Sequence, residues 1–147
     1  MKSWLYWDGR EIAQLTLGRG MMIGREWTWR DKPISFQGGS EQWLKFLTEF
    51  LGKPEGENTL KIAAAEIEGV LVVNGAGSAT GLRASAAILN ALGWAFNWSF
   101  VDCSDDDSVG LASAINSEKM RPIFILKYAQ SAKITVPKLA GSEQTKA

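Results

Sequence analysis

The sequence predicts one α/β domain in which a mixed β-sheet is flanked by helices. Three strand-like segments with alternating apolar residues fill the first third of the chain, and helical and strand-like segments alternate after them. The chain has 147 residues, of which 46% are apolar, so its length suits a single domain with a substantial core.

The N-terminal third is expected to be a meander of three strands. Residues Ser3–Asp8 contain three aromatic side chains, and the pair Asp8-Gly9 is typical of a hairpin turn. Residues 11–17 alternate again and predict the second strand, and residues 21–29 predict the third. The expected strand-ending residues are Gly18, Gly20 and Pro33.

A first helix is expected over residues 41–51, with Ser40 as its N-cap and Gly52 at its C-terminal end. Its apolar residues cover more than one stripe, because Leu44 and Leu51 lie beside the i, i+3, i+4, i+7 series. Such a helix is either deeply buried or carries a surface for a partner.

Helices and strands alternate in the rest of the chain. The complete order βββαβαβαβ is that of a ribonuclease H-like domain, whereas a doubly wound domain begins with βαβ. The segments concerned are strands at residues 70–73, 98–102 and 123–127, with helices at residues 82–92 and Ser108–Ser117.

We expect this domain to be cytoplasmic and to span residues 1–130. A remnant strand of a second lobe is predicted at residues 131–138, and a disordered polar tail at residues 139–147. A single cysteine, Cys103, excludes an internal disulfide, and no signal-peptide pattern or membrane-length apolar run is seen. We therefore expect no membrane association.

The chain contains no histidine, which removes Ser-His-Asp and Cys-His mechanisms and ordinary zinc sites. Its 16 basic and 16 acidic residues balance, which argues against a general nucleic-acid or membrane-surface binder. Any chemistry would therefore have to use carboxylates, lysine or backbone amides, and no metal or cofactor is predicted.

The glycine-rich segment at residues 75–81 has two interpretations. As Gly75-x-Gly77-x-x-x-Gly81 between a strand and a helix, with Asp102 after the next strand, it is a partial match to a dinucleotide site. It lacks the lysine of a P-loop. Alternatively the glycines allow a tight turn, Thr80 caps the helix, and small residues let another helix approach.

Residues 75–83, Gly-Ala-Gly-Ser-Ala-Thr-Gly-Leu-Arg, resemble the Gly-Pro-Gly-Ser-Phe-Thr-Gly-Val/Leu-Arg signature of the TsaB (YeaZ) family. Ala76 replaces the proline and Ala79 the phenylalanine. The resemblance extends over roughly residues 1–130, the N-terminal domain of such proteins. The matching motif residues are Gly75, Gly77, Ser78, Thr80, Gly81 and Arg83.

The resemblance implies the actin-like (ASKHA) form of the ribonuclease H-like fold. It also implies a non-catalytic scaffold in the synthesis of tRNA N6-threonylcarbamoyladenosine (t6A), which agrees with the absence of histidine. Its partner would be a catalytic TsaD-like subunit or a second copy of itself, with tRNA contacted only through the complex and a nucleotide bound at most within it. The docking surface would be two helices. We predict contacts from Leu44, Lys45, Thr48 and Leu51 on the first helix and from Ser85, Leu89 and Leu92 on the second.

Two further candidate sites come from acidic and aromatic residues. Asp8 and Asp102 both end predicted strands and could form a two-carboxylate metal site, although Asp8 in a hairpin turn is the simpler interpretation. The run of residues 105–107 could bind a cation, although a solvated loop that supplies acidic charge to a helix N-terminus is the simpler interpretation. Four N-terminal tryptophans near several arginines could stack on bases, but core packing is favoured. They are Trp4, Trp7, Trp27 and Trp29.

Overall fold

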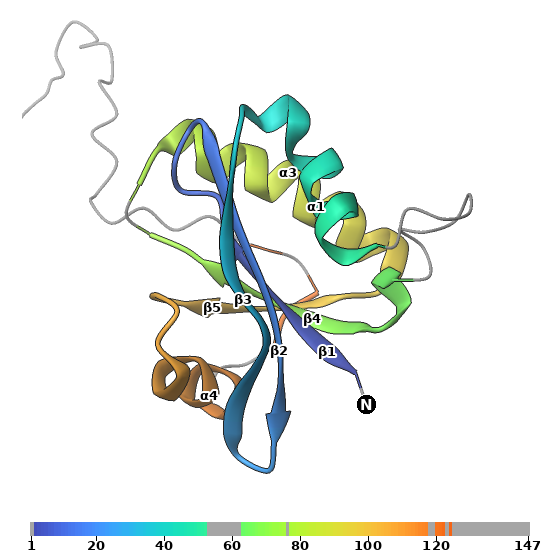
Figure 1. Ribbon diagram of the computed structural model, residues 1–147, viewed down its shortest axis with the longest axis vertical. Coiled ribbons are helices and arrows are strands. Elements are labelled where there is room, and N and C mark those ends of the chain that lie inside the picture. Colours follow the sequence, from blue (N-terminus) through green and yellow to red (C-terminus); the bar gives the residue numbers. More distant parts are fainter. Residues whose placement is uncertain (1, 53–62, 76, 118–119, 123, 125–147) are drawn as a thin grey trace, which may run out of the picture.

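One mixed sheet forms the middle layer of the structure (Figure 1). Its strands are β1 (Ser3–Asp8), β2 (Gln14–Ile23), β3 (Glu26–Gln37), β4 (Ile67–Val73) and β5 (Ser99–Cys103). Their spatial order is β3-β2-β1-β4-β5, with β1 to β3 antiparallel and β4 parallel to both of its neighbours. This is the predicted ribonuclease H-like arrangement, and the fold class is confirmed.

Helices cover both faces of the sheet (Figure 1). The 3-10 turn η1 (Ser40–Gln42) leads into α1 (Trp43–Leu51), which lies with α3 (Ala79–Phe96) on one face, called face A here. The helix α4 (Ser108–Ser117) packs on the opposite face B. The described order of elements therefore follows the predicted βββαβαβα.

The central strand β1 is buried on both sides. Leu5 and Trp7 point into the core on face A, whereas Trp4 and Tyr6 point into the core on face B. Side chains alternate between the two faces of a strand, so both parities of β1 must be apolar. This explains why residues 4–7 form an unbroken run of large apolar side chains instead of alternating with polar residues.

The boundary between β2 and β3 differs from the prediction. β2 continues through Gly18 and Gly20 to Ile23, and the turn falls at Gly24, which has a φ of +65°. Pro33 does not end β3, because β3 is the edge strand of the described sheet and a missing backbone N–H is tolerated there. Asp8-Gly9 is not a two-residue hairpin, since β2 begins only at Gln14.

The helix termini also differ in detail. α3 extends from Ala79 to Phe96, with Gly93 inside it rather than at its end. Its N-cap is Ser78, whose side chain accepts a hydrogen bond from the backbone N–H of Gly81, and not Thr80. Ser40 does not cap α1 with its side chain, because residues 40–42 form the 3-10 turn.

The predictions for the C-terminal region fall largely outside the part of the chain that is described. The computed structural model places residues 2–52, 63–75, 77–117, 120–122 and 124. Apart from Phe124, the predicted strand at residues 123–127, the remnant strand and the polar tail lie beyond it. None of the helices in the described ranges is long and apolar enough to cross a membrane.

Candidate functional site

The loop between β4 and α3 turns on two glycines. Gly75 has a φ of +120° and Gly77 a φ of +132°, which side-chain-bearing residues rarely adopt. Ser78 then begins the helix as its N-cap. The predicted turn role of the two glycines is therefore supported by their backbone geometry.

This loop packs against the chain that follows β1. The backbone N–H of Ser78 donates to the carbonyl oxygen of Arg10 at 2.7 Å. A Cβ on Gly81 would collide with the carbonyl oxygen of Gly9, and one on Gly77 would collide with the Arg10 side chain. The space in front of the loop is thus occupied by Gly9 and Arg10, which favours packing over a cradle for an anion.

Arg10 is itself held by Asp8. Its Nε and Nη2 donate to the two carboxylate oxygens of Asp8, each at 2.9 Å. This hydrogen bonding raises the pKa of the Arg10 guanidinium. The Asp8 carboxylate is therefore already paired with a cation of its own chain.

The predicted two-carboxylate site does not form. Asp8 follows the face B parity of Tyr6, whereas Asp102 follows the face A parity of Phe100, so the two carboxylates lie on opposite faces. Asp102 accepts from Arg121 Nη2 at 2.8 Å and from Asn74 Nδ2 at 3.1 Å. Within the described ranges no cluster of three or more potential metal-ligating side chains occurs.

The acidic run before α4 has a structural role. The Asp107 carboxylate accepts from the backbone N–H of Gly110 at 2.9 Å and so caps the helix. Asp105 in turn accepts from the backbone N–H of Asp107 at 3.0 Å. The solvated-loop interpretation of this run is therefore supported.

The N-terminal tryptophans belong to the cores and not to a base-stacking platform. Trp4, Trp7 and Trp27 are buried, and Trp29 is half-buried with its ring edge-on to Trp27. Bases could not stack on rings that the sheet and helices already cover. The base-stacking alternative is wrong, and the favoured core interpretation is confirmed.

Two ionisable groups are buried on face B. Burial, with the nearby Asp8 carboxylate as a second cause, raises the pKa of the Cys103 thiol. The same two causes raise the pKa of the Tyr6 hydroxyl. Both side chains therefore stay neutral at physiological pH, and Cys103 is a core thiol, as expected from the sequence, and not a nucleophile.

Three of the predicted docking residues are core residues. Leu51 and Leu89 pack within the face A core, and Ser85 accepts a hydrogen bond from the indole Nε1 of Trp7 at 2.8 Å. Their side chains are occupied inside the domain, so in this fold they are not available to a partner. The prediction of partner contact is wrong for these three.

The remaining predicted docking residues are less buried. On α1, Leu44 is 46% exposed, Lys45 is exposed, and Thr48 is half-buried and donates its hydroxyl to the carbonyl oxygen of Leu44 at 2.9 Å. These three residues lie at the surface of α1, where a partner could reach them. Leu92 on α3 is half-buried and packs against the face A core.

The position of α1 shows which way its free side faces. Phe46 and Phe50 on one side of α1 pack against Phe36 of β3, the edge strand. Leu44 and Thr48 occupy the other side of the helix by the 100° rotation per residue. That side faces away from β3, and Leu44 is exposed on it.

The solvent side of α3 was not predicted in full. Thr80, Arg83, Ala87, Ala91 and Trp94 recur at helical spacing and are all exposed, Trp94 by 89%. Among the large apolar side chains in the described ranges, Trp94 is the most exposed, and its neighbours on this side of α3 include two alanines. Trp94 follows Arg83 by eleven residues, which is close to three helical turns, so the sequence could have indicated that the two side chains lie on the same side of the helix. The outer face is defined here as Leu44, Lys45, Thr48 and these five residues. Leu92 does not belong to it, because two residues along a helix separate it from Trp94 by about 200°.

The fold and this surface define a ribonuclease H-like domain with a two-helix outer face. No family model matches the chain, and no curated protein does so either. Among solved structures, it is similar to an uncharacterized protein with similarity to peptidase YEAZ from Pseudomonas aeruginosa, at 14% identity and a TM-score of 0.48. It is also similar to YeaZ from Pseudomonas aeruginosa, at 17% identity and a TM-score of 0.45.

Both similarities extend over 71% of this chain but over only 44% and 45% of those chains. The chain thus spans less than half the length of the structures that it matches. At such identities a likeness concerns the fold alone.

Proposed function

We propose that this protein is a non-catalytic docking subunit of t6A synthesis, which binds a catalytic TsaD-like subunit, a second copy of itself, or both. The proposal rests on the signature-like motif at residues 75–83 together with the outer face of α1 and α3. In this proposal tRNA is contacted by the assembled complex.

The observation that carries the proposal is the exposed apolar surface of the outer face. Leu44 is 46% exposed and Trp94 is 89% exposed, and the alanines between Arg83 and Trp94 add no bulk. A large aromatic group beside small residues is typical of an anchor that fills a pocket of a partner. The low bulk of α3 lets a partner helix approach its backbone closely.

Two further observations favour docking over catalysis. The chain contains no histidine to act as a general base or metal ligand. The carboxylates of Asp8 and Asp102, at the ends of β1 and β5, are each bound by an arginine of the same chain. Neither of these carboxylates is poised to bind a cation.

The test measures binding between the purified chain and the TsaD-like subunit of the same source by isothermal titration calorimetry, and self-association by light scattering after size-exclusion chromatography. We expect Leu44→Arg and Trp94→Arg each to weaken at least one of these associations by about tenfold or more, because truncating an anchor costs about 2 kcal/mol. Circular dichroism establishes that each variant is folded.

Val109→Arg is the matched control. Val109 is 77% exposed on α4, on the opposite face of the sheet, so this variant adds the same charge to an equally accessible apolar position. It should bind as the wild type does. Folded Leu44→Arg and Trp94→Arg variants that keep full affinity for both the subunit and a second copy would refute the proposal.

A further inference from the structure

A cavity of about 400 Å³ lies on face B, away from the outer face of α1 and α3. It opens between the turn joining β2 and β3 and the exposed side of α4, in the lower part of the view in Figure 1. Its volume falls within the range of small-molecule sites, which begins near 300 Å³. Its principal lining residues are Arg25, Glu26, Trp27, Val109, Ala112 and Ser113.

The charged groups of the cavity are one cation and one anion. Arg25 and Glu26 are both exposed at its rim, and neither forms an ion pair with any residue that the structure places. A ligand with a single charge would be attracted by one of them and repelled by the other. A ligand carrying both charges satisfies both at once.

The apolar groups of the cavity belong to β3 and α4. Trp27 is 6% exposed and Ala112 is 8% exposed, so both are held rigidly in the face B core. Val109 is 77% exposed beside them, and an apolar group placed in the cavity would cover it. Rigid apolar walls with charges at the rim suit a small molecule with an apolar body.

One hydrogen-bonding group of the cavity is accessible among the residues named above. The side chain of Ser113 lies at the exposed side of the cavity, and its hydroxyl can donate to a carboxylate oxygen of a ligand. The indole Nε1 of Trp27 is closed off from solvent, so Trp27 contributes its ring to the wall and not a hydrogen bond to the ligand.

We propose that this cavity binds a small zwitterion with an apolar body, namely an aromatic or large aliphatic α-amino acid. Its carboxylate pairs with Arg25, its ammonium group pairs with Glu26, and its side chain covers Val109. This goes beyond the proposed docking function, because it concerns the other face of the sheet and different residues.

The test uses the full-length chain labelled with nitrogen-15 and three probes that share a phenylethyl body. L-phenylalanine carries both charges, 3-phenylpropanoate lacks the ammonium group, and 2-phenylethylamine lacks the carboxylate. The indole N–H resonance of Trp27 is the reporter, assigned by its disappearance in Trp27→Phe. We expect L-phenylalanine to shift it with a Kd on the order of 1 mM, and each analogue to bind roughly fivefold more weakly or worse.

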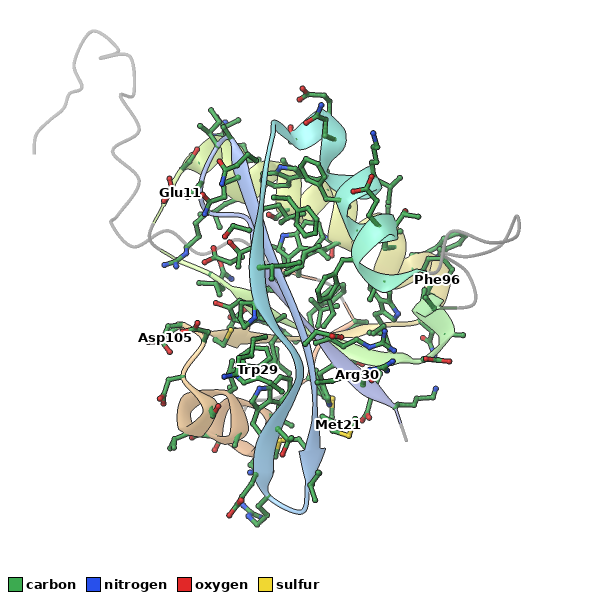
Figure 2. The ribbon with its side chains drawn as sticks, viewed as in Figure 1. Glu11, Met21, Trp29, Arg30, Phe96 and Asp105 are labelled. Atoms are coloured by element: carbon green, nitrogen blue, oxygen red, sulfur yellow. The ribbon has the colours of Figure 1, made fainter. Side chains whose placement is uncertain are left out.

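Two exposed variants test the recognition without disturbing the core. Arg25→Gln and Glu26→Gln should each weaken L-phenylalanine binding by roughly threefold to tenfold. Arg30→Gln is the matched control, because Arg30 is an exposed cation of β3 that does not line the cavity (Figure 2), and this variant should bind like the wild type. The proposal is overturned if L-phenylalanine causes no shift up to about 10 mM, if the analogues bind equally well, or if both variants keep wild-type affinity.

Discussion

Replacing Gly81 by alanine tests whether the glycine loop is a packing device. Gly81 lies in the first turn of α3, where an alanine would ordinarily stabilise a helix by up to about 1 kcal/mol. Here the new Cβ would collide with the carbonyl oxygen of Gly9 and approach that of Arg10 to 3.2 Å. Both atoms belong to the backbone and cannot rotate away, so Gly81→Ala should destabilise the protein.

The magnitude follows from three contributions. Overpacking at a rigid contact costs about 1–3 kcal/mol. Moving α3 away from Arg10 also stretches the hydrogen bond from the Ser78 N–H, which adds about 1 kcal/mol. Subtracting the helical gain leaves an expected net loss of about 2 kcal/mol in the free energy of unfolding.

Urea unfolding followed by circular dichroism measures this loss, and Gly110→Ala in α4 is the control. A Cβ on Gly110 would lie 3.6 Å from its nearest neighbour, an oxygen of Asp107, which is an ordinary contact. That variant should therefore gain about 0.5 kcal/mol. If Gly81→Ala gained stability as Gly110→Ala does, the close approach of Gly9 would not be the reason for this glycine, and the packing interpretation would be wrong.

Two further predictions concern the buried polar groups. Ser85→Ala removes the acceptor of the buried Trp7 indole, and should lower the free energy of unfolding by about 1–3 kcal/mol in the same urea assay; no loss would mean that the indole finds another acceptor. The raised pKa of Cys103 keeps its thiol neutral when folded, whereas the unfolded thiol ionises near pH 8.5, so its contribution is complete below that pH and is lost as the pH rises. Between pH 9 and 10 stability should fall by about 1.2 kcal/mol from this group, and Cys103→Ser should remove that part of the slope; an unchanged slope in the variant would contradict it.

Local patterns predicted some elements to the residue. The bounds of β1 and of α4 agree with the expectation, because the aromatic run of Ser3–Asp8 and the capped segment Ser108–Ser117 carry their signals within a few residues. The expectation failed where a glycine serves a distant side chain. Gly18 and Gly93 were expected to end elements, yet both lie inside them.

The physical reason for these two errors is the same. A Cβ on Gly18 would lie 2.8 Å from the ring of Trp29, and one on Gly93 would lie 2.6 Å from the ring of Phe100. Each glycine makes room for an aromatic ring of a neighbouring strand, and not for a turn. Nothing within a few residues of the glycine reveals that ring, so local rules interpret it as a break.

The candidate docking surface was predictable only in part, because the sequence does not show how α3 is rotated against the sheet. The excess apolar residues of α1 indicated an outward group, and Leu44 is indeed exposed. On α3 the many small side chains form no clear apolar stripe, so the sequence does not show which side of the helix faces the sheet. In the structure the inner side carries Ser85, which accepts a hydrogen bond from the indole N–H of Trp7. Leu89 consequently faces the core, and the side with Trp94 faces outward.

The pairing of β1 has a consequence for how the chain acquires its structure during synthesis. β1 can join β2 and β3 once the first 37 residues have emerged, because Trp4 pairs with Gly20 and the turn at Gly24 is local. Its other edge pairs with β4, where Trp4 lies opposite Gly69, so it stays open until much more of the chain is made. The most aromatic strand of the protein thus waits longest for its second neighbour, and such a delay is the interval in which a nascent chain depends on chaperones.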